Sequence, residues 1–344
     1  MSLEESVLQG DRLALARLLT RIENDADDGD AALDILFPHA GRAHLIGVTG
    51  APGTGKSSLV NQLALHFRKQ GKRIAIVAVD PSSPFTGGAV LGDRVRMRDL
   101  SGDHGVFIRS MASRGSVGGL ARATANVVQV FDAAGYEIIM IETVGAGQSE
   151  VDIARLAHTT LVVEAPGLGD DIQAIKAGIL EIADIIVVNK ADRPGAENTE
   201  KALKSMLDLA HPVNKVYVHH GTLAPIHLSS SRARRMEGDR EGNGGGWLPP
   251  IQKTIAIDGK GIDELAQHIA RHGEYLKVSG DWTVREHARL ESELEAALQY
   301  ILMDQFRGRV SEARFNKVVS QVFKRTLSPG EAAKALTTGN GRLK

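Results

Sequence analysis

The sequence of 344 residues contains no cysteine. Disulfide bonds, cysteine-ligated zinc sites and metal transfer through thiolates are therefore excluded. The sequence also lacks an apolar run of about 18 residues, which is the length that a membrane-spanning helix needs. Its first residues, Met1–Ser6, have neither the basic start nor the apolar stretch of a secretory signal. These absences predict a cytoplasmic protein without a membrane partner.

Neither sign of charge is in excess. Lys and Arg number 41 and Asp and Glu number 42, so the formal net charge is −1. Such a balance gives no electrostatic attraction to nucleic acid or to an anionic membrane. In the polar, glycine-rich stretch 228–246 the arginines are offset by acidic residues, and no aromatic residue lies among them. This stretch is predicted to be a solvated loop, and no nucleic-acid partner is expected.

Short apolar runs alternate with helical patterns between about Arg42 and Asp192. The runs are 45–48, 74–79, 106–108, 138–141, 160–163 and 185–188. Runs that are apolar at every position predict strands buried on both faces, as in a mainly parallel α/β sheet flanked by helices. One more strand is expected at 253–257.

Helical segments are expected before and after this sheet. Apolar residues recur at helical spacing at Leu15, Leu18, Leu19 and Ile22. After Tyr275 the chain is strongly helical, and Ser328–Glu331 has the pattern of a capping box. We therefore predict a helical N-terminal extension (1–40), a nucleotide-binding domain (41–275) and a helical C-terminal arm for dimerisation (276–344). Packing of this arm against its own domain is the alternative.

One segment fits the phosphate-binding pattern G-x-x-x-x-G-K-[ST] and lies between an apolar run and a helical stretch. Its glycines allow backbone amides to point at phosphates, and the following helix adds its positive dipole end. Lys56 is expected to bind the β and γ phosphates and to act in catalysis, and Ser57 to bind magnesium. The expected nucleotide contacts of this P-loop are Gly50, Pro52, Gly53, Thr54, Gly55, Lys56, Ser57 and Ser58.

A second motif, Asn189-Lys190-Ala191-Asp192, directly follows the apolar run 185–188. The Asp192 carboxylate can accept hydrogen bonds from the ring N–H and the amine of guanine, whereas adenine would leave one oxygen unpaired. Asn189 is expected to tie the loop together, and Lys190 to lie against the base. Together with the P-loop, this motif predicts GTP and GDP as the ligands.

Other candidate residues follow the remaining strands. Glu142 ends a buried strand and is expected to contact magnesium directly or through a second shell, and to serve catalysis. The Gly145 amide is placed to sense the γ phosphate, and Gln148 either orients water or lies on the surface. Asp80 and Asp93 are candidate magnesium-side carboxylates, with a capping role as the alternative for each.

These motifs, together with Val79–Pro84 and Leu91–Arg94, resemble those of the MeaB/ArgK-type GTPases, P-loop GTPases of the SIMIBI class. Further matching strings are Thr86–Gly88, Arg114–Gly115 and Glu142–Glu150. The resemblance implies a homodimeric, magnesium-dependent GTPase. It also implies a chaperone of an adenosylcobalamin-dependent acyl-CoA mutase, such as methylmalonyl-CoA mutase, that gates cofactor loading and the removal of inactivated cofactor.

In such proteins a mobile segment, matched here by Pro166–Lys176, relays the nucleotide state to the mutase. Lys176 is therefore a further candidate for catalysis, although a simple helix cap explains the segment almost as well. Residues 212–246 depart from the family in being longer and more polar. Two other functions are kept as alternatives, a GTP-dependent metallochaperone and a protein kinase of an amino-acid transport system.

Overall fold

The computed structural model describes residues 2–24, 27–81, 97–100, 102–113, 119–143, 149–167, 181–209, 218–219, 222–223 and 246–337. The chain divides into two compact units, 1–289 and 290–344. Of the described helices, none is both long enough and apolar enough to cross a membrane.

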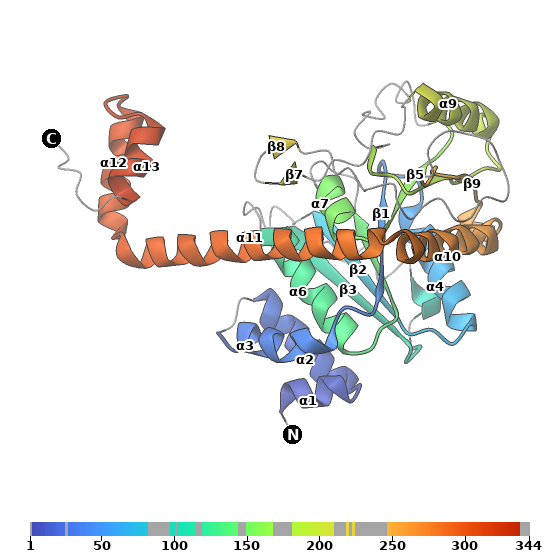
Figure 1. Ribbon diagram of the computed structural model, residues 1–344, viewed down its shortest axis with the longest axis horizontal. Coiled ribbons are helices and arrows are strands. Elements are labelled where there is room, and N and C mark those ends of the chain that lie inside the picture. The colour runs from blue at the N-terminus through green and yellow to red at the C-terminus, as the bar shows by residue number, and fades with distance from the viewer. Residues whose placement is uncertain are drawn as a thin grey trace. The chain divides into compact units, whose positions relative to one another are not determined.

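Within the described residues, seven parallel strands form the sheet of the first unit, in the order β3-β2-β4-β1-β5-β6-β9 (Figure 1). They are β1 His44–Thr49, β2 Ile74–Pro81, β3 Val106–Ser113, β4 Ile138–Thr143, β5 Thr159–Glu164, β6 Ile185–Val188 and β9 Ile251–Lys253. A separate antiparallel pair joins β7 (Val218–His219) to β8 (Thr222–Leu223). The parallel α/β sheet that the apolar runs predict is confirmed.

Helices cover both faces of the large sheet. α4 (Lys56–Lys69) and α10 (Ile262–Ser279) pack on the face formed by residues such as Ile46, Met140 and Leu161. α6 (Gly119–Ala133), α7 (Ser149–Leu156) and α9 (Ala196–Leu209) pack on the opposite face. Successive strand residues enter opposite cores because side chains alternate along a strand.

The N-terminal helices pack on the outer side of α6. They are α1 Leu3–Leu8, α2 Arg12–Glu23 and α3 Asp27–Leu36, followed by the turn η1 Phe37–His39. The repeat from Leu15 to Ile22 is buried in the same core as α6, so the predicted amphipathic helix is confirmed. The Arg109 guanidinium of the edge strand β3 pairs with Glu23, which joins α2 to the sheet.

The strand expected at 253–257 is wrong in its position. β9 covers Ile251–Lys253, and a 3-10 turn, η5, occupies Ala256–Asp258. The chain leaves the sheet here because the Asn189 side chain binds both the Thr254 hydroxyl and the Ala256 amide. A side-chain contact from another strand therefore overrides the local apolar pattern.

The second unit is helical in its described part. It contains the later part of α11 (Asp281–Arg309), α12 (Glu312–Phe323) and α13 (Pro329–Thr337). Val318, Ala332 and Leu336 form its small core. The capping box is confirmed, because Ser328 N donates to Glu331 Oε2 at 3.0 Å and Glu331 N donates to Ser328 Oγ at 3.3 Å. The helix η2 (Arg98–Leu100) belongs to the first unit.

Candidate nucleotide site

The P-loop joins the end of β1 to the start of α4, and two of its positions require glycine. Gly50 has φ +136°, and a Cβ there would lie 2.1 Å from the Val163 carbonyl oxygen of β5. Gly55 has φ +92°, and a Cβ there would lie 2.5 Å from Asn189 Nδ2. Only glycine combines these backbone angles with such close approaches. The loop is therefore held tightly between β5 and the loop after β6.

Lys56 is the first residue of α4, and its side chain is buried with 6% exposed. Its Nζ donates to the carbonyl oxygens of Gly50 at 2.8 Å and Ala51 at 3.0 Å. The ammonium group thus lies within the loop and beside the N-terminus of α4. Both features favour an anion at this place.

Ser57 and Glu142 meet at the carboxyl edge of the sheet. Ser57 Oγ donates to Glu142 Oε1 at 2.7 Å, and both residues are buried. The contact exists because β4 pairs with β1, with Glu142 next to Val48, just before the P-loop begins. Two buried oxygen-bearing side chains therefore meet here, one of them on Ser57, the residue that follows Lys56.

Asn189 links three loops. Its Nδ2 donates to the Thr54 carbonyl oxygen of the P-loop at 2.8 Å. Its Oδ1 accepts from Thr254 Oγ1 and from the Ala256 amide, each at 3.1 Å. The side chain is 2% exposed, so all three bonds are shielded from water. The predicted role of Asn189 in tying its loop together agrees with this geometry, which extends to the P-loop and to the segment after β9.

Lys190 and Asp192 follow Asn189 in the same loop and are less buried than it. Lys190 has φ +56°, and its Nζ donates to the Gly53 carbonyl oxygen at 2.5 Å. Asp192 is exposed.

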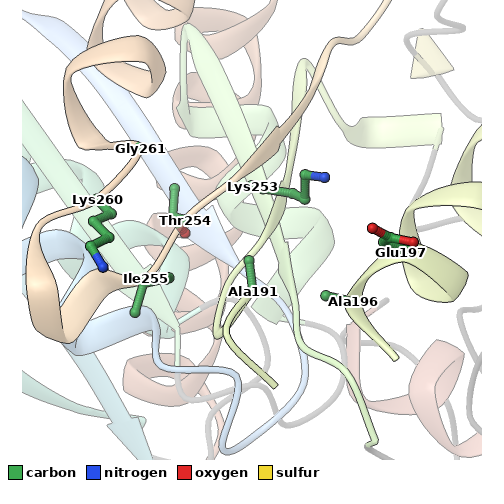
Figure 2. A pocket seen from close by; sticks show the side chains of 8 residues that line it. All are labelled: Ala191, Ala196, Glu197, Lys253, Thr254, Ile255, Lys260 and Gly261. Atoms are coloured by element: carbon green, nitrogen blue, oxygen red, sulfur yellow. The ribbon is translucent and has the colours of Figure 1, made fainter. Parts of the chain in front are cut away.

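A pocket of about 240 Å³ borders the same loop at Ala191, and Figure 2 shows Lys260 and Glu197 on opposite sides of that residue. The remaining lining residues are Ala196, Lys253, Thr254, Ile255 and Gly261.

Most of the predicted site residues lie at this edge of the sheet. In the P-loop, Pro52 and Gly53 are exposed, Thr54 is buried and Ser58 is half-buried in α4. The Asp80 backbone lies near the end of β2, opposite Ala112 of β3, and its side chain is outside the described part of the structure. The predictions for Asp93, Gly145, Gln148 and Lys176 fall outside the described residues.

Sequence reasoning missed the segment Thr254–Ala256, which the structure joins to Asn189. Its only signal was its place directly after the last strand of a parallel sheet, where loops gather at the carboxyl edge. The apolar residues of the segment instead predict a continuation of the strand.

Among the described residues, no group of three or more His, Asp and Glu side chains could hold a metal ion alone. A divalent cation at Ser57 and Glu142 would therefore need oxygens from the nucleotide or from water. Mg²⁺ is commonly bound in this way, through one or two protein oxygens together with substrate phosphates.

Comparison with known proteins identifies relatives over nearly the whole chain. A family model described as "Methylmalonyl Co-A mutase-associated GTPase MeaB" matches residues 15–311. A protein of Pyrococcus abyssi that carries a GTPase name is 42% identical over 329 residues, covering 96% of this chain and 93% of the relative. GTPase ArgK of Escherichia coli is 32% identical over 334 residues, covering 96% and 93%.

Two further matches add to this picture. The mouse protein named "Methylmalonic aciduria type A homolog, mitochondrial" is 30% identical over 292 residues, covering 85% of this chain and 64% of its own length. The crystal structure of an LAO/AO transport system kinase superposes with a TM-score of 0.66 at 24% identity, covering 97% of this chain and 95% of that one. The latter likeness supports the fold.

Proposed function

Because the chain belongs to the MeaB family of methylmalonyl-CoA mutase-associated GTPases, we propose that its GTP hydrolysis serves an adenosylcobalamin-dependent acyl-CoA mutase. Hydrolysis of GTP to GDP and phosphate would gate cofactor loading and the removal of inactivated cofactor. The observation that best supports a guanine nucleotide site is the Asn189 side chain. It joins the P-loop to the loop that carries Asp192, so one ligand can be held at its phosphates and at its base.

The phosphate end would be bound by the P-loop amides, the N-terminus of α4 and Lys56. In this proposal the Lys56 ammonium leaves the Gly50 and Ala51 carbonyl oxygens and binds the β and γ phosphates. Its charge, held in a buried position, would stabilise the negative charge that develops in phosphoryl transfer. Gln148 would orient the attacking water, and the Gly145 amide would sense the γ phosphate. Lys176 remains the further candidate for catalysis.

Ser57 and Glu142 fit a magnesium ion, because both present oxygen atoms at a buried position beside Lys56. Bound there, the ion would neutralise charge on the β and γ phosphate oxygens. Asp80 and Asp93 are proposed as further carboxylates on the magnesium side of this site. The Glu142 carboxylate would also hold the Ser57 hydroxyl in position.

The first test replaces Lys56 by Ala and measures the release of phosphate from GTP. We expect the rate to fall by about 100-fold or more, because a preorganised charge at the transition state is lost. Lys69→Ala is the matched control, since Lys69 is an exposed lysine at the end of the same helix. Undiminished hydrolysis by the Lys56 variant, with the wild-type circular dichroism spectrum, would remove the assigned role.

The mutase partner is supported by the name of the family and by the relationship to the mouse methylmalonic aciduria type A homologue. The test loads the full chain with a non-hydrolysable GTP analogue and looks for co-migration with methylmalonyl-CoA mutase on size-exclusion chromatography. We expect a complex whose amount differs between the GDP and analogue states. If no complex forms while GTP is still hydrolysed, the partner is wrong and the GTPase assignment stands.

The two alternative functions have separate tests. Transfer of labelled γ phosphate to a transport protein would support the kinase, whereas release as free phosphate alone counts against it. Stoichiometric metal in the purified protein would favour the metallochaperone. The cytoplasmic location and the absence of a nucleic-acid partner stay predictions, checked by cell fractionation and by a DNA and RNA gel-shift assay.

A further inference from the structure

The start of α11 is fastened to the amino ends of the strands, at the opposite edge of the sheet from the P-loop. Trp282, the second residue of α11, stacks on the His158 ring, with ring centroids 3.9 Å apart and planes tilted by 24°. His158 directly precedes β5, and its side chain is only 4% exposed. The buried His158 ring and the half-buried Trp282 ring thus join the helix to the sheet.

The hydrogen bonds of His158 determine where its proton lies. The Leu45 backbone N–H of β1 donates to His158 Nδ1 at 3.0 Å. His158 Nε2 lies 2.5 Å from Glu286 Oε1 of α11. Because a backbone N–H can only donate, Nδ1 carries no proton, so Nε2–H donates to the Glu286 carboxylate. The ring is therefore neutral, with both nitrogens engaged.

Two arginines of α11 strengthen the same contact. The Arg285 guanidinium donates to the His158 carbonyl oxygen and makes two bonds of 2.9 Å to the Asp184 carboxylate. Arg289 pairs with Glu286 at 2.8 Å. The first two turns of α11 are thus held by a continuous set of ion pairs and hydrogen bonds.

The remaining groups that face His158 come from β1 and α10. The His44 ring centroid is 6.1 Å from that of His158, and His44 Nε2 lies 2.7 Å from Thr159 Oγ1. The same hydroxyl lies 2.8 Å from His272 Nδ1 of α10. The Lys277 ammonium, also of α10, lies 5.2 Å from the centre of the Trp282 ring. Among the side chains named around His158, only the carboxylates of Glu286 and Asp184 carry a negative charge.

The charges around the ring have opposing effects on its titration. Burial lowers the pKa of His158, and the hydrogen bond to Glu286 raises it, while Arg289 and Arg285 lower it. Burial alone would raise the pKa of Glu286, but His158 and Arg289 bring it down to about 2, so this carboxylate stays ionised. His158 is therefore the group of this pair that gains a charge on acidification, below the ordinary pKa of a histidine.

We propose that the cluster of His158, Trp282, Arg285 and Glu286 is an acid-sensitive latch that holds the first two turns of α11 on the sheet. A proton taken from solvent by Nδ1 turns this atom into a donor that faces the Leu45 N–H donor. The Leu45 bond breaks, the ring leaves its place under Trp282, and the contact between helix and sheet loosens. The released residues, Asp281–Arg289, belong to the first unit.

The test follows the full-length protein from about pH 7.5 to about pH 4, because burial moves the titration of His158 below the ordinary histidine range. Hydrogen exchange detected by mass spectrometry reports the amides of Asp281–Arg289, and tryptophan fluorescence reports the stack on His158. Trp282→Phe identifies the part of the fluorescence that belongs to this ring. In the wild type we expect the Trp282 fluorescence to change on acidification, because the stack on His158 is lost, and exchange in this peptide to rise about tenfold beyond the intrinsic pH effect.

Two substitutions on the same contact decide the assignment. His158→Asn keeps an acceptor near Leu45 N but cannot titrate, so both pH responses should disappear. His287→Gln is the matched control, because His287 is an exposed histidine of the same helix, and it should keep the wild-type responses. A flat wild-type profile, a response retained by the His158 variant, or a response lost in the control would each overturn the proposal.

A third variant covers the case in which His158→Asn does not fold. Glu286→Gln removes the carboxylate that stabilises a protonated His158, so the midpoint of the fluorescence change should move to lower pH. A midpoint equal to that of the wild type would show that His158 is not the titrating group.

Discussion

Asp192 is the residue on which the proposed choice of base depends. Asp192→Asn keeps the shape of the side chain but replaces one accepting oxygen by a donating NH₂ group. We expect GTP to bind about 10- to 100-fold more weakly, since a hydrogen bond to a charged group is lost. Xanthosine triphosphate should gain affinity, because xanthine carries an accepting oxygen where guanine has its amine.

Equilibrium binding of the three triphosphates of guanosine, xanthosine and adenosine measures this change. Asp34→Asn is the control, since Asp34 is an exposed aspartate of α3. If Asp192→Asn leaves the preference for GTP unaltered, another group reads the base.

Asp132 is a residue whose importance lies in stability. Its buried carboxylate accepts from three successive amides before β1, those of Gly41 at 2.7 Å, Arg42 at 3.1 Å and Ala43 at 3.0 Å. Asp132→Ala leaves these donors without their acceptor, and we expect the free energy of unfolding to fall by about 2–4 kcal/mol. Urea denaturation measures the change.

Asp11→Ala is a suitable comparison for that substitution. Asp11 also accepts from two backbone amides, at the exposed N-terminus of α2, and its loss should cost about 1 kcal/mol. Equal losses of stability in the two variants would show that the burial of the three amides bound by Asp132 does not determine the loss.

At the scale of elements, the contact of α10 and α11 with the strand starts makes the stability of the first unit depend on pH. Burial, followed by the neighbouring side chains of His158, His272 and Lys277, lowers the pKa of His44 to about 3. The pKa of His158 is lowered as well, with burial as the main cause. Below about pH 6.5 the unfolded chain takes up protons at these rings, whereas the folded chain takes them up only at lower pH.

The free energy of unfolding should therefore fall as the pH drops below about 6.5, by at most about 1.4 kcal/mol per pH unit for each histidine. For His44 this decline continues toward pH 3, the folded pKa. Glu286 does not counteract this decline. A carboxyl group whose pKa is lowered by folding stabilises the folded state above its ordinary pKa of 4.5, and this stabilisation is lost only as the pH falls below that value. Urea denaturation at several pH values gives the slope, and stability that is flat or rises on acidification would contradict the prediction.

The elements themselves were predictable where local pattern decides them. The apolar runs gave six strands of the sheet because a strand buried between two helical layers is apolar on both faces. The capping box at Ser328 was equally local, since its two hydrogen bonds join residues three positions apart. The apolar run at 253–257 predicted a strand in the wrong position, because Asn189, which follows β6, holds Thr254 and Ala256 in a turn.

At the scale of the whole molecule, the helical second unit exposes apolar side chains on α11 and α12. On α11, Leu294 is 61% exposed, Leu298 49% and Ile301 49%, at a spacing of four and three residues. On α12, Phe323 is 86% exposed. Exposed apolar residues at this spacing are typical of a helix that packs against a partner helix. They support the proposed homodimer.

The dimer is tested with the double substitution Leu298→Glu and Ile301→Glu. We expect light scattering to report a dimer for the wild type and a monomer for this variant. In a symmetric dimer the introduced glutamates of both copies would be buried in the interface, and the burial of unpaired charges is unfavourable. Ser292→Glu with Gln299→Glu adds the same charge at polar, exposed positions of α11 and should stay dimeric. A wild-type monomer, or an unchanged dimer in the apolar-face variant, would refute the proposal.

The sequence by itself determined the parallel α/β sheet, the P-loop and the loop of Asn189 and Asp192, because each depends on contiguous residues whose order and periodicity carry the information. Only the tertiary structure decided that Glu142 lies beside Ser57, 85 positions away, that Thr254–Ala256 joins the site, and that Arg285 binds Asp184 across 101 positions. These contacts depend on strand order and on the path of α10 and α11. Local propensity does not encode such choices, because they follow from which distant surfaces bury each other best.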